Sequence, residues 1–126
     1  MAQGKILVVE DHPLNRELIV TLLRARGYTV LEAKDGLGLL ERVKAERPAL
    51  IIMDLQLPHI DGFTLTRQLK ADVETRDIPV VASSSFAKPE DQMQALNAGC
   101  VASLTKPLNL PVLLETVAGL LSQGVP

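Results

Sequence analysis

Residues 49–58 of this 126-residue chain read ALIIMDLQLP, an apolar run that leads into the carboxylate of Asp54. The run is too short for a helix and is rich in Leu and Ile, which predicts a β-strand buried on both faces. Such strands lie inside parallel sheets, and open α/β sheets bind their ligands at the carboxyl ends of their strands. A strand-end aspartate can also simply cap a turn. The other strand ends must therefore decide whether Asp54 belongs to a functional site.

The composition suits one domain with an aliphatic core. Apolar residues make up 47% of the chain and aromatic residues only 2%, so bases or flavin rings would find few stacking partners. The net charge of −2, without a run of like charges, is unlike that of a nucleic-acid binder. The single Cys100 excludes an internal disulfide, and we expect it to be buried. Because no stretch resembles a signal peptide or a membrane span, we expect a soluble, cytoplasmic protein that does not bind membranes.

Strands and helices alternate along the whole chain. The apolar patterns predict strands at residues 5–9, 28–33, 49–54, 78–82 and 101–104. They predict helices from Pro13 to Gly27, Leu37 to Pro48, Gly62 to Asp72 and Pro89 to Gly99, and over 110–121. This alternation predicts an α/β fold with a doubly wound, five-stranded parallel sheet of order 2-1-3-4-5 and five helices, as in flavodoxin-like proteins. We therefore expect residues 1–126 to form a single domain.

Charged and polar side chains stand where the predicted strands end. Glu10 and Asp11 follow the first strand, Asp54 ends the third, Ser84 follows the fourth and Lys106 follows the fifth. The carboxyl ends of parallel strands share one edge of a sheet, so these side chains should converge there. Neighbouring carboxylates repel each other unless a cation joins them, and oxygen ligands at a shallow site suit Mg²⁺. A lysine and a serine supply partners for phosphoryl oxygens, and without a glycine-rich phosphate loop we expect the phosphoryl group on Asp54 itself.

Taken together, these residues resemble the receiver domain of two-component response regulators. The resemblance covers essentially the whole chain, and within the family the chain looks most like single-domain regulators of the bacterial cell-division type. Because the chain stops just after the fifth predicted helix, we expect no output domain. The matching segments are Glu10-Asp11, residues 53–58 with Asp61-Gly62, residues 78–82 with Ser84, and Lys106-Pro107.

The resemblance implies a phosphoacceptor and a metal site. Asp54 would accept a phosphoryl group from a phosphohistidine on a histidine kinase or a histidine phosphotransfer protein. Mg²⁺ would bind Asp11, Asp54 and the backbone carbonyl of Gln56, and Glu10 would act through bound water. The protein would not be an enzyme in the usual sense, although it would promote its own phosphorylation and dephosphorylation.

The resemblance also implies roles in phosphoryl binding and in switching. Lys106 and the switch hydroxyl of Ser84 would bind the phosphoryl oxygens, and the Lys106-Pro107 peptide bond would be cis. Gln56 and Phe86 stand at positions that vary in the family and influence how long the phosphoryl group survives.

Ser103 departs from the family pattern, because many receivers carry a Tyr or Phe three residues before the lysine of the fifth strand. We therefore predict a conformational response that is muted on this side of the molecule. The leading interpretation is a phosphoacceptor that signals or relays by docking on a downstream protein, without binding nucleic acid directly. The alternatives are a constitutive protein-binding module that never uses its acids, a receiver fragment of a hybrid kinase, and a flavodoxin-like cofactor binder, which the scarcity of aromatic residues disfavours.

Overall fold

Five strands alternate with five helices in the computed structural model, which describes residues 4–85 and 88–123. The strands are β1 (Lys5–Val9), β2 (Thr29–Ala33), β3 (Leu50–Asp54), β4 (Val80–Ser84) and β5 (Ala102–Thr105). The helices are α1 (Pro13–Ala25), α2 (Leu39–Glu46), α3 (Gly62–Ala71), α4 (Pro89–Ala98) and α5 (Leu110–Gln123). None of these described helices combines the length and the apolar character that a membrane crossing requires.

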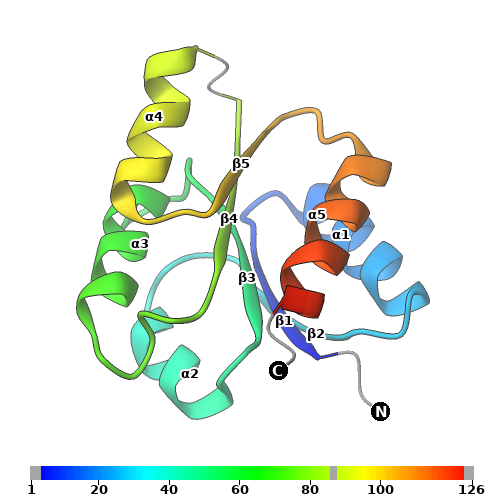
Figure 1. Ribbon diagram of the computed structural model, residues 1–126, viewed down its shortest axis with the longest axis horizontal. Helices are drawn as coiled ribbons and strands as arrows, with labels where there is room; N and C mark the ends of the chain where they lie inside the picture. Colours follow the sequence, from blue (N-terminus) through cyan, green and yellow to red (C-terminus); the bar gives the residue numbers. More distant parts are fainter. Residues whose placement is uncertain (1–3, 86–87, 124–126) are drawn as a thin grey trace.

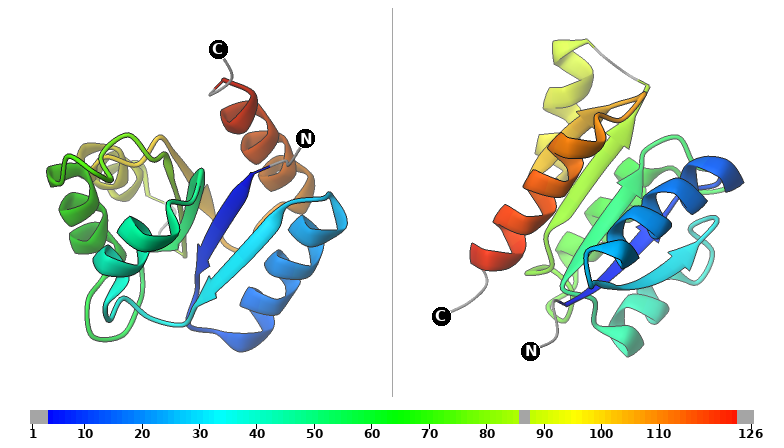
Figure 2. Two further views of the ribbon diagram at one scale, coloured as in Figure 1. Left: turned by 90° about the horizontal axis from the view of Figure 1, so that it is seen from below. Right: turned by 90° about the vertical axis from the view of Figure 1, so that its right-hand side faces the viewer.

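All neighbouring strands pair in parallel, in the order β2-β1-β3-β4-β5, which confirms the predicted topology. Helices α1 and α5 cover one face of the sheet, and α2, α3 and α4 cover the other (Figure 1, Figure 2). The strand order puts β2 and β5 at the edges of the sheet and β1, β3 and β4 in its interior. The carboxyl ends of the strands therefore lie along one edge, as the sequence predicts.

Successive strand residues point to opposite faces and build two apolar cores. The core beneath α2, α3 and α4 contains, from the strands, Leu7, Val9, Ile51, Met53, Val80 and Ala82. The core beneath α1 and α5 contains Ile6, Val8, Leu50, Ile52 and Val81. The four apolar residues of β3 are no more than 1% exposed, which confirms that this strand is buried on both faces. Cys100 is buried in the first of these cores, as predicted.

Four strands begin one or two residues later than the sequence predicts, and at β2 and β4 the first predicted residue is still hydrogen-bonded to the preceding helix or turn. The Ile78 N–H donates to the carbonyl of Thr75 at 3.1 Å, within the turn that follows α3. The Tyr28 N–H donates to Leu23 of α1. The N–H groups of Ala49 and Val101 already donate to Lys5 and Val80 of the neighbouring strands, so β3 and β5 start only one residue after the predicted position. Tyr28 and Ile78 are residue types that favour strands, but their N–H groups are unavailable for the sheet.

Helix α2 begins at Leu39, so the predicted start at Leu37 is wrong. Gly38 adopts a left-handed conformation with φ 68° and separates Leu37 from the helix. The side chain of Leu37 is accordingly 62% exposed and does not join the apolar stripe.

The outer edge of β2 is protected by arginines. The N–H of Thr29 bonds toward β1, so the peptide groups of Val30 and Glu32 face away from the sheet. Arg24 of α1 donates to the carbonyl of Val30 at 3.0 Å, and Arg42 of α2 donates to the carbonyl of Glu32. These guanidinium groups occupy the acceptors that a strand from another molecule would need.

Candidate functional site

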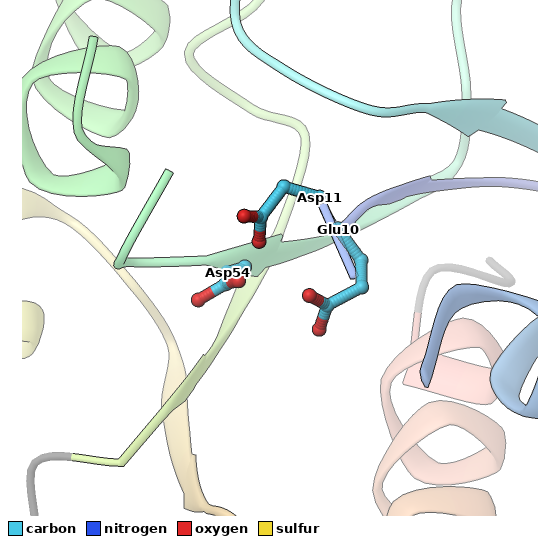
Figure 3. A group of neighbouring side chains, drawn as sticks. All are labelled: Glu10, Asp11 and Asp54. Atoms are coloured by element: carbon cyan, nitrogen blue, oxygen red, sulfur yellow. The ribbon is translucent and has the colours of Figure 1, made fainter. Parts of the chain in front are cut away.

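Three acids meet where β1 and β3 end (Figure 3). Glu10 and Asp11 follow β1, and Asp54 is the last residue of β3; one oxygen from each carboxylate lies within 4.8 Å of the others. Glu10 and Asp54 are each 1% exposed, whereas Asp11 is open to solvent. Oxygen ligands at an accessible sheet edge are those that Mg²⁺ prefers, so this cluster could hold a divalent metal ion.

Lys106 supplies a positive charge to the same site. Its Nζ lies 2.9 Å from Oε1 of Glu10 and 3.2 Å from Oδ2 of Asp54. Oε1 of Glu10 is buried, and within the described residues it makes an ion pair but no hydrogen bond. Three carboxylates against one ammonium leave an excess of negative charge when all are ionised. Both the incompletely satisfied oxygen and the excess charge fit a bound cation.

The surroundings of Asp54 disfavour its charged form. Burial raises the pKa of this carboxyl, and the neighbouring Glu10 raises it further, while a hydrogen bond from Gln56 and the charge of Lys106 act in the opposite direction. Burial alone would lower the pKa of Lys106, but Glu10 and Asp54 outweigh it and the net shift is upward. Lys106 is therefore charged at neutral pH, and further positive charge would help to keep Asp54 ionised as a nucleophile requires.

Helix α1 fixes the position of Glu10. The N–H of His12, the N-cap residue of α1, donates to Oε2 of Glu10 at 3.1 Å. Arg16 donates to the main-chain carbonyl of Glu10 at 2.9 Å and pairs with Oε1 of Glu32 at 3.3 Å. Sequence reasoning missed Arg16, because nothing in the pattern of α1 shows that this arginine reaches the end of β1.

The remaining predicted residues surround Asp54 from β3, β4 and β5. The main-chain N–H of Gln56 donates to Oδ1 of Asp54 at 2.9 Å. Ser84 is the buried last residue of β4, and its carbonyl accepts a 2.7 Å hydrogen bond from the N–H of Lys106. The peptide bond between Lys106 and Pro107 is cis. The fold thus brings the strand-end residues of the sequence prediction to one place.

Two further predicted positions are not among these residues. Ser103 is partly buried in β5, where it pairs with Ala82 of β4. Phe86 lies outside the described residues.

A cleft of about 410 Å³ adjoins the acids, between α1 and the segment that follows β5. Glu10, Ser85 and Lys106 contribute polar groups to its lining, and Leu18 and Leu108 contribute apolar ones. Leu18 is 52% exposed, although the helical pattern alone would suggest a core position. An apolar wall next to a polar site is typical of a surface that a ligand or another protein covers.

The proteins to which this chain is similar in sequence are response regulators. The sequence model of the response regulator receiver domain matches residues 6–118. The polar-differentiation response regulator DivK of Brucella anthropi is 39% identical over 119 residues, which are 94% of this chain and 97% of that protein. DivK of Brucella ovis is 38% identical with the same coverage.

Solved structures agree with the sequence comparisons. The receiver domain of a signal transduction histidine kinase from Syntrophus aciditrophicus has a TM-score of 0.89 and 34% identity, covering 97% of this chain and 92% of that one. The receiver domain of a sensor histidine kinase from Pseudomonas aeruginosa has a TM-score of 0.86 and 32% identity, with 94% and 98% covered. That structure is described with a magnesium ion coordinated in its active-site cleft. The chain therefore belongs to the receiver domain family of bacterial two-component response regulators, as its strand-end residues predict.

Proposed function

We propose that this protein is a phosphoacceptor that takes a phosphoryl group from a histidine kinase or a histidine phosphotransfer protein onto Asp54. The observation that carries the proposal is the position of the Asp54 carboxylate between the ammonium of Lys106 at 3.2 Å and the N–H of Gln56 at 2.9 Å, with two further acids alongside. In the reaction an oxygen of Asp54 attacks phosphorus, the P–N bond to the donor imidazole breaks, and the imidazole leaves with a proton.

The acids are suited to hold Mg²⁺. Asp11, Asp54 and the main-chain carbonyl of Gln56 would bind it directly, and Glu10 would act through water. When bound, the ion supplies charge neutralisation for the transferring phosphoryl oxygens. Lys106 contributes a second positive charge, since it already lies between the two buried carboxylates.

The phosphorylated protein would act by docking on a downstream protein. A phosphoryl group adds negative charge and three acceptor oxygens beside Ser84 and Lys106, and this favours a changed arrangement of the segment after β4. Ser103 cannot reproduce the inward movement of an aromatic side chain, so we expect little rearrangement of β5. Gln56 and Phe86 would tune the lifetime of the phosphoryl group. We place the protein in the cytoplasm, where its kinase partner would present the phosphohistidine.

The cleft beside the acids is the proposed binding site of the phosphodonor protein. It joins an apolar wall, which includes Leu18 and Leu108, to the charged groups of Glu10 and Lys106. A donor that packs on this wall would deliver its imidazole close to Asp54 and exclude water from the reaction.

Phosphorylation by acetyl phosphate tests the proposal. With Mg²⁺, the wild type should gain one phosphoryl group in intact-mass measurements, and Asp54→Asn should gain none. Asp11→Asn should retain the fold but bind Mg²⁺ more weakly in calorimetry, because one ligand loses its charge. A wild type that stays unlabelled, or an Asp54→Asn variant that is labelled equally, would contradict the proposal and support a constitutive binding module. Phosphotransfer profiling against the histidine kinases of the source organism would then identify the pathway.

A further inference from the structure

The side chain of Gln56 joins two loops at the mouth of the site. Its main-chain N–H donates to Asp54, and its side-chain Oε1 accepts a 2.9 Å hydrogen bond from the N–H of Ser85. Gln56 follows β3, and Ser85 is the first residue after β4. The side-chain bond therefore ties Ser85 to the segment that directly follows the phosphoacceptor Asp54.

The N–H of Ser85 is a donor that a phosphoryl group could use. Asp54 pairs with Ser83 across β3 and β4, so the end of β4 runs beside the phosphoacceptor. Ser85 also lines the cleft that contains Glu10 and Lys106. Phosphoryl oxygens bind main-chain N–H groups strongly, because the acceptor is charged. In the structure described here, this N–H is already occupied by Oε1 of Gln56.

We propose that Gln56 acts as a latch, a side chain that holds Ser85 in its unphosphorylated position until the phosphoryl group competes for the N–H of Ser85. This inference rests on the proposed function of Asp54. Gln56 is exposed, so the latch bond competes with water and is weak enough to open. It would nevertheless bias the equilibrium between the two arrangements, because it exists in only one of them.

Removing the acceptor should favour the phosphorylated arrangement. Gln56→Met keeps the length of the side chain but cannot accept the hydrogen bond, whereas Gln56→Glu retains an acceptor. Gln56→Asn retains an acceptor on a side chain that is one methylene shorter and should fail to reach Ser85. Gln68→Met, at an exposed position of α3, is the matched control.

The first measurement is amide hydrogen exchange of Ser85 by NMR in the metal-free, unphosphorylated protein. A hydrogen bond of ordinary strength predicts exchange about two- to tenfold faster in Gln56→Met and Gln56→Asn. Exchange should be unchanged in Gln68→Met and close to the wild-type rate in Gln56→Glu. This readout requires neither phosphoryl transfer nor metal.

The second measurement is the affinity for beryllium fluoride with Mg²⁺, a mimic of the phosphoryl group on a carboxylate. Gln56→Met should bind it about two- to tenfold more tightly than the wild type, since the latch no longer opposes binding. If Asp54 of the wild type is labelled but Gln56→Met changes neither exchange nor affinity, the latch is wrong and the proposed function stands. If the wild type is not labelled at all, the proposed function fails and the latch fails with it.

Discussion

Gly62 provides a sharp test of how the fold positions the phosphoacceptor. It is buried at the start of α3, where its N–H bonds to the carbonyl of Leu55 at 3.1 Å. A Cβ atom at this position would lie 2.4 Å from the carbonyl oxygen of Asp54 and 2.7 Å from the Cα of Leu55. Both contacts are with main-chain atoms of the segment that holds Asp54, which cannot rotate away. Gly62→Ala must therefore move the helix or the end of β3.

Two effects of Gly62→Ala oppose each other. Overpacking of this kind costs about 1–3 kcal/mol in the free energy of unfolding, and the rigid main-chain contacts favour the upper end of that range. Replacing a helical glycine by alanine returns at most about 1 kcal/mol. The overpacking term is larger, so we expect a net destabilisation of about 1–2 kcal/mol and a melting temperature lower by about 4–10 °C.

Gly119 in α5 is the matched control. A Cβ atom at Gly119 would meet nothing within 4 Å, and the residue is exposed. Gly119→Ala should therefore gain up to about 1 kcal/mol from helix propensity alone. The two variants make the same chemical change and should shift stability in opposite directions.

Thermal and urea denaturation followed by circular dichroism measure both variants. Calorimetric titration with Mg²⁺ adds a second readout, since a displaced Asp54 should weaken metal binding in Gly62→Ala but not in Gly119→Ala. If Gly62→Ala melts at or above the temperature of the wild type, α3 does not approach β3 as closely as the structure shows, and the reasoning fails.

The edge of β2 and the surface ion pairs give two further predictions. Arg24→Ala combined with Arg42→Ala should increase self-association in sedimentation velocity, because the outward carbonyls of β2 lose their partners. Arg67→Ala, at an exposed position of α3, is the control. A double variant that stays purely monomeric would contradict the protection of the β2 edge by these arginines. Asp72 is hydrogen-bonded to Lys44 at 2.7 Å, which lowers the pKa of Asp72 and raises that of Lys44. The stabilisation from Asp72 should be present above its unfolded-state pKa and lost as the pH falls through its lower folded-state pKa. The stabilisation from Lys44 should instead be lost as the pH rises through its raised folded-state pKa. Urea denaturation at several pH values should show a smaller loss of stability in acid for Asp72→Asn, and an unchanged pH profile would exclude the pair as a contributor.

The sheet order and the placement of the acids were predictable because they depend on local pattern and on general rules of winding. Apolar runs of strand length mark buried parallel strands, and right-handed crossovers leave few orders for five of them. Strand-end acids then share an edge whatever the details of packing. Asp11, Asp54 and Lys106 could therefore be grouped although they lie far apart along the chain.

The first residues of strands and helices were less predictable, because they depend on which partner takes each main-chain group. Ile78 is apolar and β-branched, yet its N–H bonds in a turn and its carbonyl accepts a 2.6 Å hydrogen bond from Lys70. Leu37 continues the apolar spacing of α2, but the left-handed Gly38 places it outside the helix. The spacing of apolar residues indicates which positions are buried, but it contains no information on these competing hydrogen bonds.

From the sequence alone follow the doubly wound sheet, the convergence of acids, serine and lysine at one edge, and the family. Only the tertiary structure shows that Arg16 holds the end of β1, that the Gln56 side chain bonds Ser85 across 29 residues of chain, and that the Glu10 carboxylate is buried against Lys106. The first group depends on periodicity and topology, which local residue types encode. The second depends on the reach and direction of single polar side chains, which are determined only when the packed elements fix the positions of their partners.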